Sequence, residues 1–268
     1  MRRAGKSGIF SKIYLAFIVA LMYIPVILTV IYSFNANKSP TVWGGFSMKW
    51  YEELAGDRSI REALGNSLLL AFGSCFFAIL IGTSGALGMR GRQSKFDGVI
   101  AYLSTLPIMI PEIILGMVFL GVFSFMNLPF GMVTLMIAHT AFCIPYVFMM
   151  VRARLEGMDK NLEEAALDLG ARPFAVFRDI TFPAILPAIL SGALLSFAMS
   201  FDDVVISIFV TGARTNTLAI KIYTKLKTGV TPEINALATI LLIVTAAVIL
   251  LSRGIGRHKE KSQEIETP

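Results

Sequence analysis

Charged residues are scarce in this sequence of 268 residues. Asp, Glu, Lys and Arg make up 16% of the chain, whereas a soluble domain usually carries about 25%. Apolar residues make up 55%, and the mean hydropathy is +0.70. A single water-facing domain cannot bury so much apolar surface. The composition therefore excludes an ordinary soluble domain and indicates a chain that lies in lipid.

The residues of metal binding and covalent catalysis are also few. The chain has two cysteines, Cys75 and Cys143, and two histidines, His139 and His258, at spacings that match no zinc site or disulfide framework. It has no complete phosphate-binding loop and neither an H-E-x-x-H nor a G-x-S-x-G motif. We therefore expect no catalytic residue, no metal site and no cofactor in this chain. Energy for any work against a gradient must come from elsewhere.

Long uncharged runs are what the sequence does contain. Ile13–Tyr32, Leu64–Met89 and Ile234–Ser252 hold 20, 26 and 19 residues without a charge, and about 20 apolar residues make a helix that spans the hydrocarbon. The uncharged run Ile113–Val151 is too long for one span, and Asn, Pro and Gly in Phe125–Gly131 mark a turn within it. The sequence predicts an all-α membrane protein with a single transmembrane domain over residues 1–268. Its six helices are expected at about 12–33, 64–89, 98–125, 131–151, 183–211 and 234–253.

The basic residues predict the orientation of these spans. With the N-terminus inside, the inner tails and loops hold 16 Lys and Arg residues and the outer loops hold 8. Because Lys and Arg concentrate on the cytoplasmic side, both termini are expected in the cytoplasm. The net charge of +6 is then a topology signal with lipid headgroups as its partner. It does not indicate a nucleic-acid surface, because the basic residues are spread over every loop.

Two adjacent carboxylates, Asp202 and Asp203, interrupt the apolar run of the fifth predicted span. A charge at mid-membrane costs at least about 2.5 kcal/mol, so such residues face the bundle interior or a water-filled path. Asp202 follows Pro187 by about 22 Å of helix, in the outer half of the bilayer. Adjacent residues on a helix point about 100° apart. Both can line one path only where the helix unwinds. Otherwise one could face a substrate while the other caps or pairs, or one or both could cap a broken helix or pair with a lysine of a partner subunit.

Glu112 and Tyr223 are the other candidates for a substrate pathway. Glu112 follows Pro111, and an acid in this position also suits the first turn of a half-helix. Tyr223 falls in the outer loop between the fifth and sixth spans, where an aromatic ring could hold an amine by a cation–π contact. His139 lies within the fourth span, and a buried, hydrogen-bonded histidine is the more common role for such a residue than a ligand.

The longest cytoplasmic loop contains a predicted short helix at about 161–170. Asn161 can cap it, and Glu163 with Glu164 places acids in its first turn. Leu162, Ala165, Ala166 and Leu169 give it an apolar face. Gly170 and Pro173 then end the helix. On periodicity alone, this segment is an ordinary connecting helix.

The spacing of this loop makes a resemblance specific. The loop resembles the E-A-A-x3-G-x9-I-x-L-P signature of importer-type ABC transporter permeases at Glu164-Ala165-Ala166, Gly170, Ile180 and Pro183, with Phe182 in place of Leu. The resemblance implies a type I importer permease fold and a coupling helix that docks on an ATPase subunit. In that role Glu164 would make the polar contact, Ala165 and Ala166 would permit close packing, and Gly170 would make the turn.

Further segments resemble the permeases of bacterial spermidine/putrescine importers, and more closely the second of the two permeases. They are "SFDDVVISIFVTG", "LAIKIY", "TPEINALATILLIVT", "NSLLLAF" and "HTAFCIPYVF". The resemblance implies an inner-membrane subunit that imports polyamines by alternating access. Its expected partners are a second homologous permease, two copies of a cytoplasmic ATPase that binds ATP and Mg, and a periplasmic polyamine-binding protein.

The chemistry of a polyamine fits intramembrane acids, since spermidine carries about three positive charges at neutral pH. Two alternatives stay open at this point. One is the same machinery with another small solute, such as ferric ion or thiamine. The other is an ion-coupled secondary transporter, which would work without an ATPase.

Overall fold

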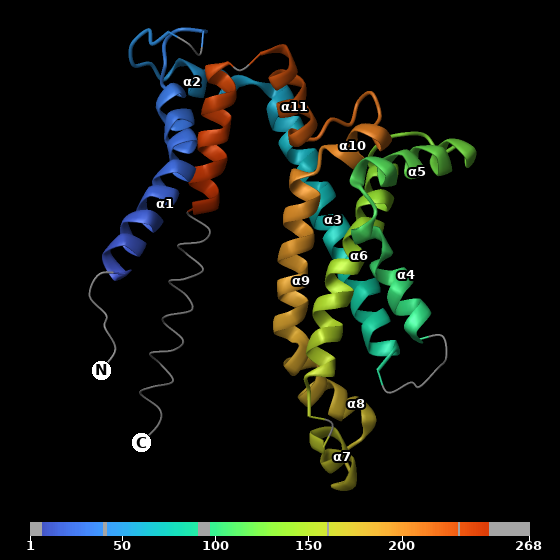
Figure 1. Ribbon diagram of the computed structural model, residues 1–268. Coiled ribbons are helices and arrows are strands. Elements are labelled where there is room, and N and C mark those ends of the chain that lie inside the picture. The colour runs from blue at the N-terminus through green and yellow to red at the C-terminus, as the bar shows by residue number, and fades with distance from the viewer. Residues whose placement is uncertain (1–6, 40–41, 91–96, 160, 230, 247–268) are drawn as a thin grey trace. The chain divides into compact units, whose positions relative to one another are not determined.

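The computed structural model describes residues 7–39, 42–90, 97–159, 161–229 and 231–246 (Figure 1). Its elements are helices, as expected where lipid offers no partner for backbone N–H and C=O groups. Within the described ranges, Asn35 and Phe46 form an isolated antiparallel β-bridge. The described residues fall into two compact units, one drawn from 1–58 and 224–268 and the other from 59–223.

Four helical segments are long and apolar enough to cross a membrane: Phe10–Tyr32, Arg58–Gly88, Met132–Glu156 and Pro173–Asp202. A bent pair of helices at Gly98–Met109 and Glu112–Phe125 makes a fifth, and Pro232–Ala246 is a shorter apolar helix. These six segments overlap the six predicted spans. Residues 247–253 of the last predicted span lie outside the described part of the chain.

In the unit of residues 59–223, α6 (Met132–Glu156) packs against α9 (Phe182–Asp202), and α3 (Arg58–Gly88) contacts both (Figure 1). Small residues allow the close approach, as is usual between helices in a membrane. Gly192 of α9 lies against the backbone of Val147, and a Cβ there would be 3.0 Å from the Val147 Cα. Val147 is fully buried.

Gly192→Val is expected to lower the free energy of unfolding by about 1–3 kcal/mol, because the added side chain forces α6 and α9 apart. Thermal denaturation of the purified protein in detergent measures the change. Gly121→Val is the matched control, since that helical glycine has open space where its Cβ would be. Equal melting temperatures for the two variants would contradict the close packing.

Two predicted spans are interrupted in the structure. Where the sequence predicts one helix over 98–125, the chain forms α4 (Asp97–Met109) and α5 (Glu112–Phe125), bent by 106°. Pro111 precedes α5 with an extended ψ of 132°, and a proline disfavours helical backbone at the residue before it. In the predicted span 183–211, α9 ends at Asp202, Asp203 is extended with ψ 126°, and α10 (Val205–Val210) follows. α10 packs against α5 and α6.

The loop before α9 contains the predicted short helix as α7 (Asn161–Asp168). The N–H of Asn161 donates to Asp159 Oδ1 at 2.9 Å, so Asp159 supplies a cap that the sequence assigns to Asn161. Gly170 has φ +85°, a left-handed conformation that glycine adopts without strain, and ends the segment as predicted. The chain then forms α8 (Pro173–Val176) and the π-helical turn η1 (Phe177–Thr181), which runs directly into α9.

In the other unit, α1 (Ser7–Tyr32) and the helix Pro232–Ala246 line a shared groove that includes Pro25 and Leu242. The chain after α1 folds around the buried side chain of Asn35, whose Oδ1 accepts from the N–H of Gly44 at 2.7 Å. Trp50 of α2 (Lys49–Gly56) donates its indole N–H to the Asn35 carbonyl at 2.7 Å. α11 (Leu218–Thr228) begins in the unit of residues 59–223.

Candidate functional site

Asp203 lies at the break between α9 and α10 and caps the second helix. Its Oδ1 accepts from the N–H of Ile206 at 3.2 Å, and its Oδ2 accepts from the N–H of Ser207 at 2.8 Å. A carboxylate at this position satisfies the free N–H groups of a helix N-terminus and interacts favourably with its dipole. The residue is 8% exposed. Of the roles that the sequence left open for the two acids, the structure gives the capping role to Asp203.

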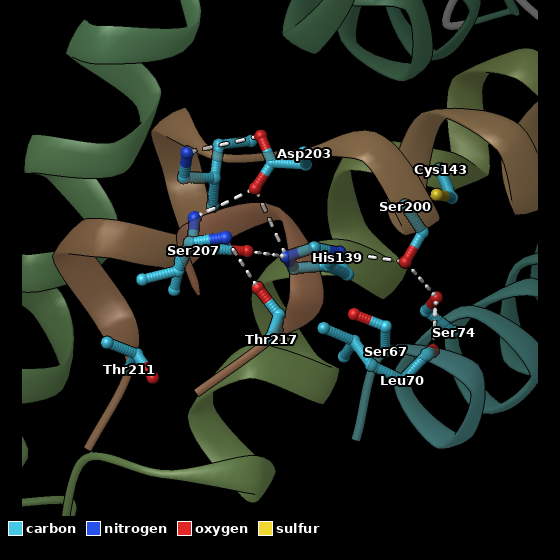
Figure 2. A network of polar contacts seen from close by, with 12 residues as sticks. Ser67, Leu70, Ser74, His139, Cys143, Ser200, Asp203, Ser207, Thr211 and Thr217 are labelled. Carbon is cyan, nitrogen blue, oxygen red and sulfur yellow. Dashed lines mark hydrogen bonds and ion pairs between the residues drawn. The ribbon is translucent and has the colours of Figure 1, made fainter. Parts of the chain in front are cut away.

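His139 of α6 holds the same break from the side, as Figure 2 shows. The residue is fully buried, and its Nε2 is 2.9 Å from Ser207 Oγ and 3.4 Å from Asp203 Oδ2. Its Nδ1 is 2.8 Å from Ser200 Oγ on α9. One imidazole therefore joins the last turn of α9 to the first turn of α10. The prediction of a buried, hydrogen-bonded histidine is confirmed.

The network continues from α9 to α3. Ser200 Oγ is 2.9 Å from Ser74 Oγ, and Ser74 also bonds to the carbonyl of Leu70 at 2.7 Å (Figure 2). Ser74 and Ser200 are buried. Buried polar groups are costly unless they are hydrogen-bonded, and here each has a partner. The network thus fixes α3, α6, α9 and α10 at the depth of the break.

Asp202, in contrast, is exposed on the surface of the chain. The backbone at Asp203 is extended, so the two adjacent carboxylates differ in environment. The carboxylate of Asp203 caps α10, whereas that of Asp202 is exposed. A carboxylate that is exposed next to an interrupted membrane helix can attract a cation, because charges within a membrane face a partner or a water-filled path. At the break, Asp202 is therefore the acid whose side chain is exposed, whereas Asp203 is buried in the cap.

The structure places the remaining pathway candidates on two other helices. Glu112 is the first residue of α5 and is exposed there. α5 packs against α10, so Glu112 belongs to a helix that contacts the segment after the break. Tyr223 lies on α11 and is 37% exposed. Pathway roles for Asp202, Asp203, Glu112 and Tyr223 stay predictions.

The short helix α7 has an exposed apolar side. Leu169, directly after the helix, is 90% exposed, and Leu162 is 59% exposed. Glu164 and Ala165 are exposed as well, and Ala166 is half-buried. Glu163, which the sequence offered only as a first-turn acid, points inward to Arg90 and Thr181. Sequence spacing could not have found this contact, because Arg90 is 73 residues earlier in the chain.

Among the residues that the structure describes, no group of three or more His, Cys, Asp or Glu side chains could hold a metal ion. Cys75 and Cys143 are buried free thiols.

Comparison with known proteins shows the protein family to which this chain belongs. Residues 76–264 match the family model of the binding-protein-dependent transport system inner membrane component. The chain belongs to this family. It is therefore a multi-pass membrane component of a transport system that works with a binding protein, and the prediction of a transport subunit is confirmed.

Two individual relatives show which transport permeases this chain is similar to in sequence. The chain is 38% identical over 259 residues to the spermidine/putrescine transport system permease protein PotC of Escherichia coli K12, which covers 97% of this chain and 96% of the relative. It is 42% identical over 250 residues to the putrescine transport system permease protein PotI of the same strain, over 90% of this chain and 89% of the relative. These findings confirm the predicted resemblance to spermidine/putrescine permeases.

Solved structures agree on the fold. The chain matches a crystal structure of a bacterial ABC transporter involved in the import of the acidic polysaccharide alginate with a TM-score of 0.70 and 13% identity. The match covers 96% of this chain and 99% of the other. A chain of the MetNI methionine ABC transporter in an inward-facing form matches with a TM-score of 0.61 and 19% identity, over 72% of this chain and 92% of the other. The predicted importer permease fold is confirmed.

Proposed function

We propose that this chain is a permease subunit of an ATP-driven importer that moves spermidine or putrescine into the cytoplasm. The observation that carries the proposal is the sequence identity of 38–42% to polyamine permeases over 90–97% of the chain. The intramembrane acids support it, because a polyamine is a multiply charged cation that needs carboxylates along its path.

Asp202 is the proposed substrate contact at the helix break. It is exposed, whereas both oxygens of Asp203 accept hydrogen bonds from the backbone of α10. Asp203 then acts through its neighbour, since the cap sets where α9 ends and where Asp202 projects. Glu112 on the adjoining helix is a second proposed acid, and Tyr223 a proposed aromatic contact for the methylene chain or an amine.

The proposed assembly has this chain beside a second, homologous permease, with both termini in the cytoplasm. Two copies of an ATPase subunit, which bind ATP and Mg, would dock on the coupling helices, and a periplasmic polyamine-binding protein would deliver substrate. The exposed leucines beside Glu164 and Ala165 on α7 support the docking, since an apolar surface in water favours a partner. Alternating access follows: ATP closes the ATPase dimer and opens the path outward, and hydrolysis resets the inward state.

Uptake of labelled polyamine tests the pathway. Asp202→Asn is expected to lower ATP-dependent spermidine uptake about two- to fivefold in vesicles with the reconstituted complex, because a single exposed ion pair contributes at most about 1 kcal/mol. Glu156→Gln is the matched control, as it removes one exposed acid at the cytoplasmic end of α6.

The outcomes separate the alternatives. Uptake that persists in Asp202→Asn and falls in Glu112→Gln would move the substrate contact to α5. An assembled complex that hydrolyses ATP but takes up no spermidine or putrescine would overturn the polyamine substrate. Uptake without any ATPase subunit would point to an ion-coupled transporter.

A further inference from the structure

Glu163 connects three cytoplasmic segments through a single carboxylate oxygen. Its Oε1 accepts from Arg90 Nη1, just after the end of α3, and from the hydroxyl of Thr181, the last residue of η1. The side chains of Arg90 and Glu163 are 17% and 22% exposed, and Thr181 is 4% exposed. Ion pairs shielded in this way are screened by salt much less than surface pairs.

α7 packs on α8 and η1. Between α7 and the end of α3 lies an open pocket of about 360 Å³, lined among others by Leu87 and Leu167. Among the described residues, the recorded polar link from α7 across this pocket is the ion pair of Glu163 with Arg90. The ion pair therefore links α7 to the end of α3 across an open pocket.

The second bond of Glu163 leads toward the helix break. Thr181 is followed without interruption by α9, which ends at Asp202. At 1.5 Å per residue, this helix carries a displacement of its cytoplasmic end over about 30 Å. A push on α7 thus reaches α3 through Arg90, and it reaches α9 through Thr181 together with the packing of α7 on α8 and η1.

We propose that Glu163 is the positioning residue that transmits movement of α7 to α3 and α9. The inference rests on the proposed function, in which α7 is the helix that an ATPase subunit moves. It assigns different tasks to adjacent acids: Glu164 faces outward to the ATPase, and Glu163 faces inward to the membrane helices. Without the pair, α7 follows the ATPase while the membrane helices lag behind.

The coupling ratio, polyamine taken up per ATP hydrolysed, is the first test in reconstituted vesicles. Glu163→Gln and Arg90→Gln are expected to lower the ratio at least about fivefold while the ATPase still co-purifies and hydrolyses ATP. The double variant Arg90→Glu/Glu163→Arg restores the opposite charges and is expected to recover at least half of the wild-type ratio. Glu156→Gln, which breaks the exposed pair with Arg152, is expected to leave the ratio unchanged.

A merely stabilising pair would lower the amount of complex and leave the ratio per complex intact, and that result would overturn the proposal. Loss of ATPase co-purification in Glu163→Gln would also overturn it, since Glu163 would then belong to the docking surface. A ratio that stays low in the charge-swapped variant would show that opposite charge is not what transmits the movement.

A cross-linking test is independent of the transported substrate. Cysteines at Leu87 and Leu167, on opposite sides of the pocket, can be joined by a short bifunctional maleimide in the assembled complex. In the wild-type background the yield is expected to stay the same when ATP is added, because the two segments move together. With Glu163→Gln, ATP is expected to change the yield at least about threefold. An equal ATP effect in both backgrounds would overturn the inference even if the polyamine assignment fails.

Discussion

Asp203→Ala is expected to lower the free energy of unfolding by about 2–5 kcal/mol, because each buried N–H group that loses its acceptor costs about 1–3 kcal/mol. The variant leaves two N–H groups of α10 without their acceptor and removes the carboxylate 3.4 Å from His139 Nε2. Thermal denaturation of the purified chain in a mild detergent measures the loss. Yield in the membrane is expected to fall with it.

Asp202→Ala is the matched control, because it removes the same carboxylate one position earlier, at an exposed site. Its melting temperature is expected to stay close to that of the wild type, while its spermidine uptake falls. A stable Asp203→Ala protein that assembles normally but does not transport would reverse the assignment and make Asp203 a substrate contact.

Replacing both exposed leucines of the α7 surface, Leu162→Glu with Leu169→Glu, is expected to weaken ATPase binding at least about 100-fold. Full burial of one leucine side chain contributes about 1.5–3 kcal/mol, and each 1.4 kcal/mol is tenfold in affinity. Both side chains are more than half exposed in the chain alone, so the folded structure does not need them.

Co-purification of the ATPase with the detergent-solubilised permease is the measurement. Leu167→Glu is a useful comparison, since Leu167 lines the pocket toward α3 instead of the outer side of α7. Undiminished binding by the double variant would remove α7 as the docking site. That result would leave the membership of the permease family untouched.

Uncharged length predicted where the helices lie, because a membrane helix must fill the hydrocarbon with about 20 apolar residues. The interruptions were harder to predict. Pro111 marks the bend between α4 and α5 in the sequence, but its 106° angle depends on packing that no local pattern contains. The end of α9 at Asp202 has no proline or glycine beside it.

The sequence predicted where the candidate site at Asp202 and Asp203 lies, but it did not predict the contacts of these side chains. Two adjacent acids in an apolar run predicted a broken helix or a split in their roles, and the structure shows the broken helix and the cap made by Asp203. Which acid caps could not be predicted, since the choice depends on His139, which lies more than 60 residues earlier on α6. The inward turn of Glu163 likewise depends on Arg90 at the end of another helix.

The capped state of Asp203 has a kinetic consequence on the proposed path. A passing cation meets one available carboxylate at the break, because the other is occupied by the backbone of α10. A single exposed ion pair contributes about 0–1 kcal/mol, or at most about a fivefold longer stay. Cargo at this point is held for a short residence time and leaves readily. The proposed contact at the break thus favours passage of a cation over tight binding.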